Sequence, residues 1–95
     1  MKTNLFSVYD SAAARFTEPW PAATVELALR RFRHTVNAEG NDIAMFPEDY
    51  TLFHVGEFDQ ETGLVTRFSS PHSLGVAVTF KDRAPSPQLV SEDDA

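Results

Sequence analysis

A chain of 95 residues has room for one hydrophobic core and therefore for one domain. Eight lysines and arginines stand against fourteen aspartates and glutamates, and the resulting net charge of −6 argues against a surface that is basic throughout and built to grip nucleic acid. The chain has no cysteine, which excludes disulfide scaffolds, cysteine-ligated zinc, iron–sulfur clusters and thiol catalysis.

The first predicted element is a short strand. Residues 5–9 alternate apolar with small or polar side chains, and Asp10 is placed to end the strand. Further along, Pro19 and Pro21 flank Trp20, and each proline disfavours the helical region in the residue before it. We therefore expect an extended passage around the tryptophan.

The clearest predicted helix covers residues 24–38. Thr24 is a suitable N-cap, because its hydroxyl can accept a hydrogen bond from a free N–H of the first turn. Gly40 suits a left-handed C-terminal cap. The apolar positions fall on one stripe that is expected to face a core, namely Val25, Ala28, Leu29, Phe32 and Val36.

The second half of the chain reads as strands. Residues 41–49 are expected to form a loop, and residues 50–58, rich in aromatic and β-branched side chains, a central strand. A hairpin loop at 59–63 leads to a return strand at 64–68, and 74–80 alternates as a further strand. Within the central strand, glycine at position 56 predicts a bulge or a close backbone approach.

These elements predict an α+β domain in which one amphipathic helix packs on a small antiparallel sheet of three to four strands. We expect the domain to span residues 1–83 and to be followed by a flexible acidic tail at 84–95. Such a tail can compete with nucleic acid for a basic patch of the same chain, recruit a basic partner, or only add solubility.

Aromatic side chains are numerous on the predicted strands. One helix covers only one face of a sheet, so some of the rings must lie on the other face. That face could form a dimer interface or a platform that stacks bases, while core packing is the simplest role for any single ring. The rings are Phe6, Tyr9, Tyr50, Phe53, Phe58, Phe68 and Phe80.

The helix carries the most suggestive polar cluster, Arg30, Arg31, Arg33 and His34. At 100° per residue, Arg30 and Arg33 point about 60° apart on one side of the stripe, Arg31 lies on the far flank and His34 lies opposite. Arginine binds phosphate through its bidentate fork and stacks on bases. The alternative is a solvated helix face with Glu26 and Arg30 as an i,i+4 ion pair.

Catalysis and metal binding find no support. The three histidines are scattered without metal-ligand spacing, and neither a glycine-rich phosphate loop nor a nucleophile elbow is present. We therefore expect no enzymatic activity, no cofactor and no metal. No apolar run reaches the roughly 18 residues of a transmembrane helix, and the polar start is unlike a signal peptide, so a soluble, cytosolic protein is expected.

Four segments together resemble a known family: LFSVYDSAA at 5–13, LALRRF at 27–32, PEDYTLFHVGEFDQETG at 47–63 and SLGVAVTF at 73–80. They resemble the small non-structural protein of the gokushovirus branch of the microviruses, which are single-stranded DNA phages. The resemblance covers about residues 4–80, and its most specific element is the 47–63 segment.

The resemblance implies a protein absent from the mature particle that acts in the host cytoplasm, in single-stranded DNA replication or genome packaging. The implied partner is single-stranded DNA. A homodimer is expected from the predicted sheet instead, because one short helix cannot cover apolar residues on both of its faces. The alternative is a protein adaptor that links the viral replication initiator or the procapsid to other proteins without touching DNA. The resemblance carries no catalytic residue to this chain.

Overall fold

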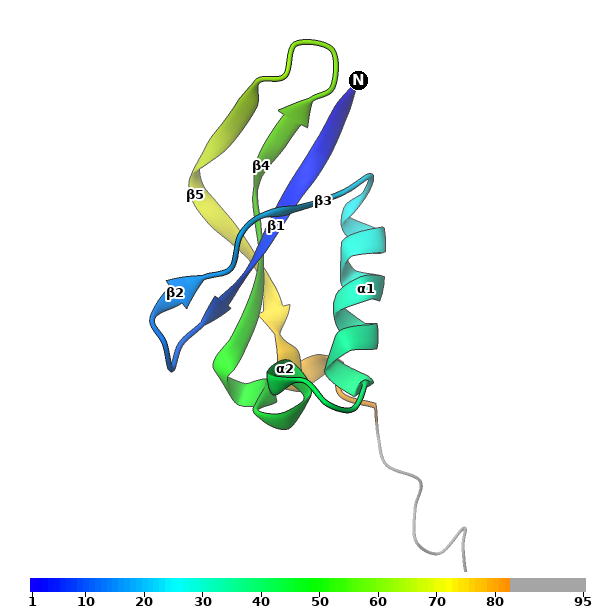
Figure 1. The fold of residues 1–95 in the computed structure, drawn as a ribbon, viewed down its shortest axis with the longest axis vertical. Coiled ribbons are helices and arrows are strands. Elements are labelled where there is room, and N and C mark those ends of the chain that lie inside the picture. Colours follow the sequence, from blue (N-terminus) through cyan, green and yellow to red (C-terminus); the bar gives the residue numbers. More distant parts are fainter. Residues whose placement is uncertain (83–95) are drawn as a thin grey trace, which may run out of the picture.

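The computed structural model describes residues 1–82; the acidic tail expected at 84–95 lies outside the described residues. The chain forms a curved antiparallel sheet with one long helix on one side (Figure 1). In chain order the elements are β1 (Lys2–Asp10), β2 (Arg15–Phe16), β3 (Trp20–Ala22), α1 (Val25–Asn37), α2 (Asp42–Met45), the 3-10 turn η1 (Pro47–Asp49), β4 (Tyr50–Asp59), β5 (Val65–Val76) and the 3-10 turn η2 (Ala77–Phe80).

The sheet has five strands, one more than the upper limit of the expected three to four. Strands β2, β1, β4 and β5 are paired in that order, and β3 also pairs with β1. The short strands β2 and β3 share the second edge of β1, at Tyr9–Asp10 and at Asn4–Phe6 respectively. The sequence pattern indicated an extended passage around Trp20, but two- and three-residue strands are too short to show a period.

Thr17 joins β2 to β3 along the edge of β1. Its backbone N–H donates to the carbonyl of Val8 at 2.9 Å, and its hydroxyl accepts from the Val8 N–H at 3.0 Å. The Ser7 hydroxyl donates to the Thr17 carbonyl at 2.6 Å, which satisfies a buried polar side chain. The edge of β1 is thereby covered between the two short strands.

The two C-terminal strands expected at 64–68 and 74–80 are in fact one strand, β5, followed by η2. The register of β4 and β5 shifts at two places, so β5 carries extra residues and still remains paired across them. After Val76 the chain turns instead of continuing, and the Thr79 hydroxyl donates to the Val76 carbonyl at 2.6 Å. The turn brings Phe80 edge-on to Phe32 of α1, with ring centroids 5.5 Å apart.

Gly56 lies at the bend of the sheet, as its position in the central strand predicts. The register shifts beside it both toward β1 and toward β5. A Cβ at this position would overlap the carbonyl oxygen of Thr66 and lie 3.2 Å from the Cα of Arg67. The two strands therefore approach so closely here that only glycine fits.

Helix α1 confirms the predicted helix. The Thr24 hydroxyl accepts from the backbone N–H of Leu27 at 3.1 Å. The predicted C-cap is displaced, because Ala38 ends the helix in an extended conformation and the left-handed Gly40 follows two residues later. The Lys81 ammonium donates to the carbonyl of Val36 at 3.0 Å and so places a positive charge at the helix C-terminus.

The core lies between α1 and the near face of the sheet. Ala28, Phe32 and Val36 are the buried residues of the helix, as the stripe predicts. The segment expected as a loop at 41–49 folds into α2 and η1 and closes one end of this core. The fully packed cluster consists of Phe6, Val8, Ala22, Ala28, Phe32, Val36, Leu52 and Ala77.

Candidate nucleic-acid interface

The outer face of α1 brings together three of the four predicted site residues. Arg30, Arg31 and His34 are all exposed and line one open groove, together with Leu27 and Thr35. The groove lies opposite the buried stripe, because positions 27, 30, 31 and 34 follow helical spacing. We call this surface the α1 groove.

Arg33 does not belong to the α1 groove. Its guanidinium pairs with the carboxylate of Asp82 at 2.5 Å, on the flank of the helix that faces the C-terminal segment. The Asn37 side chain holds the same segment, since its amide donates to the Phe80 carbonyl at 3.0 Å and its oxygen accepts from the Asp82 N–H at 2.7 Å. Of the four residues expected to form one cluster, three thus line the α1 groove, and Arg33 belongs to a separate ion pair.

The cations of the α1 groove form no ion pair with a carboxylate in the part of the chain that the structure describes. Within residues 1–82 the ion pairs are Met1 with Glu61, Lys2 with Glu57 and Arg33 with Asp82. The alternative pair of Glu26 with Arg30 is not among them. Two guanidinium groups therefore remain available for an anion on this face.

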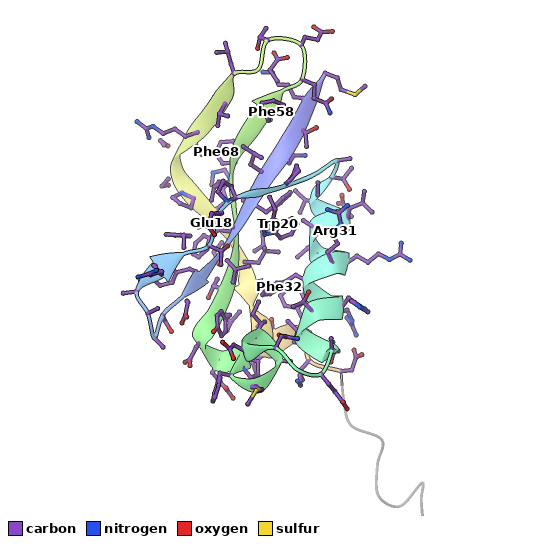
Figure 2. The ribbon with its side chains drawn as sticks, in the orientation of Figure 1. Glu18, Trp20, Arg31, Phe32, Phe58 and Phe68 are labelled. Carbon is purple, nitrogen blue, oxygen red and sulfur yellow. The ribbon has the colours of Figure 1, made fainter. Side chains whose placement is uncertain are left out.

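Arg31 is held in place by β3. One of its Nη atoms donates to the Pro21 carbonyl at 3.0 Å, which fixes the guanidinium between the helix and the strand. Because a guanidinium has five N–H donors, this bond leaves most of them free. Figure 2 shows Arg31 beside Trp20 and Phe32 at the junction of α1 and the sheet.

A small cavity opens at this junction. Its volume is about 230 Å³, and its lining residues are Val8, Trp20, Arg31, Phe32, Thr35 and Ile43. Arg31 and Thr35 also line the α1 groove, so the two hollows are neighbours that share part of their wall. The sequence did not predict this cavity, because it joins four elements that are distant in the chain; the only local signal was the tryptophan between two prolines.

The far face of the sheet is not covered by any helix among the described residues. Strand alternation places Tyr9, Phe53 and Phe58 on this face, opposite the side chains that pack under α1. Phe16 of β2 joins Tyr9 and Phe53, with ring centroids 4.8 and 5.3 Å away. The expectation that some rings must lie on a second face is therefore confirmed.

His54 occupies the near face in a cluster of rings. It stacks on Phe6 with ring centroids 4.8 Å apart, its Nε2 lies 3.1 Å from the Asn4 Oδ1, and His72 on the neighbouring strand lies 6.2 Å away between centroids. Burial lowers the pKa of His54 below its usual value of 6.5, and the nearby His72 lowers it further. The imidazole is therefore kept neutral in the folded protein at neutral pH.

We predict that mild acid destabilises the fold through His54. The unfolded chain binds this proton more tightly than the folded protein, so the contribution to stability is complete above pH 6.5 and falls as the pH drops through the lowered pKa. His54→Gln should weaken the pH dependence of unfolding, and His72→Gln should weaken it in part. Urea midpoints measured at about pH 8 and about pH 5 test this. An equal change in the midpoint between the two pH values in all three proteins would contradict it.

Neither a metal centre nor a membrane-spanning helix is found in the described part of the chain. Residues 1–82 contain no group of three or more histidine, aspartate or glutamate side chains arranged to hold a metal ion. None of the helices in this range has the length and apolar character needed to cross a bilayer.

Comparison with known proteins places the chain in a family. A family model described as phage ORF5 protein matches residues 3–80, which include every helix and strand of the structure except the first residue of β1. Neither the curated proteins nor the solved structures include a significant match. Because the family model spans well over half of the sequence, the chain belongs to the phage ORF5 protein family.

Proposed function

We propose that this phage protein is a non-structural accessory protein that binds single-stranded DNA during replication or genome packaging in a phage of the microvirus type. The observation that carries the proposal is the α1 groove, where Arg30, Arg31 and His34 lie side by side without a carboxylate partner in the described chain. Guanidinium groups bind phosphate through bidentate hydrogen bonds, so a phosphate is a suitable ligand for this groove. The resemblance to gokushovirus proteins supports DNA as the source of that phosphate.

The charge balance limits how strong this binding is. The chain as a whole carries −6, so DNA is attracted only close to the α1 groove and is repelled elsewhere. We therefore expect modest affinity with little sequence preference, since contacts to phosphate carry no sequence information.

Removing the two free arginines tests the proposal. Arg30→Ala combined with Arg31→Ala should weaken binding of a labelled single-stranded oligonucleotide by about tenfold or more at low salt, and less as salt rises. The matched control is Lys2→Ala with Arg15→Ala, which removes the same charge from exposed side chains on β1 and β2 that do not lie on the far face of the sheet. Equal loss in both double variants would show a general charge effect and would refute a site on α1.

We also propose that the protein acts as a homodimer joined through the far face of the sheet. The positions that strand register places on this face between β1, β4 and β5 carry aromatic, aliphatic and hydroxyl side chains and one arginine, but no carboxylate. In a chain of net charge −6, a surface free of acidic groups is where a second copy meets the least like-charge repulsion. Phe16 and Val65 are 44% and 65% exposed on this face.

For the dimer, light scattering is expected to give twice the 10.6 kDa of one chain. Phe16→Ser combined with Val65→Ser should shift the mass toward one chain. Met45→Ser combined with Phe46→Ser changes equally exposed apolar residues at α2 and should leave the mass unchanged. A parent protein that runs at 10.6 kDa would contradict the dimer and favour the adaptor alternative for this face.

A further inference from the structure

We infer that the cavity beside Trp20 receives one unstacked base of a single DNA strand whose phosphates lie on the α1 groove. This inference rests on the proposed function and specifies its chemistry. The protein would then contact unpaired bases as well as the phosphate backbone, and it would bind paired DNA less well than single strands.

The volume of the cavity limits the size of the group that can bind in it. Its volume of about 230 Å³ lies below the roughly 300–1,000 Å³ of pockets that hold drug-sized ligands. The walls are apolar at Val8, Phe32 and Ile43, with the Trp20 indole on one side. One flat ring system suits this space, whereas a whole nucleotide cofactor does not.

Trp20 is positioned to stack. Strand pairing sets it opposite Phe6 of β1, and the two rings lie 5.4 Å apart between centroids at an angle of 34°. This contact fixes the indole from the sheet side, while the residue remains only half-buried and still lines the cavity. A rigid, partly exposed indole loses little conformational freedom when a base stacks on it.

Arg31 connects the cavity to the α1 groove. The residue lines both hollows, and its guanidinium is held by the hydrogen bond to the Pro21 carbonyl. A base in the cavity would place its own phosphate near this guanidinium, and the next phosphates along the strand would follow toward Arg30 and His34. A nucleic-acid strand fits this arrangement better than an apolar side chain of a partner protein, because only the strand brings a phosphate to the guanidinium beside the cavity.

The experiment compares a single-stranded oligodeoxythymidine with an abasic oligomer of the same length. Trp20 is the only tryptophan, so its fluorescence reports on the cavity directly. The full chain should bind the thymidine oligomer about 5- to 160-fold more tightly than the abasic one, with quenching only by the former. Trp20→Leu should bind both oligomers equally, at the level of the abasic one.

The outcomes separate the two proposals. If the full chain binds both oligomers equally and without quenching, the base site is wrong while phosphate binding by the α1 groove stands. If neither oligomer binds at low salt, the proposed function fails and the base site fails with it. The comparison of oligomers on the unaltered chain requires no variant, so poor folding of Trp20→Leu would not affect the result.

Discussion

Phe6→Ala is expected to lower the free energy of unfolding by about 3–5 kcal/mol, the usual cost of removing a buried phenyl ring. Phe6 is 0% exposed and lies at the centre of the near face, between Trp20 and His54. The strands around it are fixed by pairing on both sides of β1, so they cannot close the space that the ring leaves. Because small domains are stable by only about 5–15 kcal/mol, this loss would remove roughly a fifth or more of the total stability.

Urea denaturation followed by circular dichroism measures this effect. Phe46→Ala is the matched control, because Phe46 is 51% exposed after α2 and its removal should cost less than about 1 kcal/mol. Similar losses in the two variants would mean that the near face of the sheet is not the core.

Gly56→Val is expected to have the second large effect on the free energy of unfolding. The sign of the change tests whether β4 and β5 approach closely at this position. On strand propensity alone, valine should stabilise the middle of β4 by up to about 1 kcal/mol. In the structure its Cβ would collide with the carbonyl oxygen of Thr66, a backbone atom of the paired strand that cannot rotate away. We therefore expect a loss of about 1–3 kcal/mol or more, as for other overpacked positions.

Thr66→Val is the control for Gly56→Val. It introduces the same side chain at an exposed position of the neighbouring strand and should change stability by less than about 0.5 kcal/mol. Thermal unfolding of both variants beside the parent protein provides the comparison. A stabilised Gly56→Val protein would contradict the close approach of β4 and β5.

Elements whose sequence pattern repeats over many residues were predictable from the sequence. The apolar stripe of α1, its Thr24 cap and the alternation in β1 and β4 each extend over enough residues to identify an element. The bend at Gly56 was also predictable, because a glycine inside an aromatic strand usually marks a bulge or a close backbone approach. Helix and sheet together were enough to predict the α+β class.

Features that depend on contacts between distant segments were not predictable. The pairing of β2 and β3 with β1 depends on Thr17, whose hydrogen bonds reach back to Ser7 and Val8. The separation of Arg33 from the α1 groove depends on Asp82, which lies 49 residues further along the chain. The cavity beside Trp20 likewise exists only once α1 and α2 have packed against β1 and β3.

The most direct test of single-strand binding by the α1 groove is the salt dependence of affinity for a labelled oligodeoxythymidine, measured with the full chain. Two free arginines predict that the logarithm of the binding constant falls with the logarithm of salt concentration with a slope of about −1.4 per bound protomer, from about 0.7 for each phosphate neutralised. Arg30→Ala with Arg31→Ala should bring this slope close to zero. An unchanged slope in that variant, or no binding by the parent chain at the lowest salt, would contradict the account.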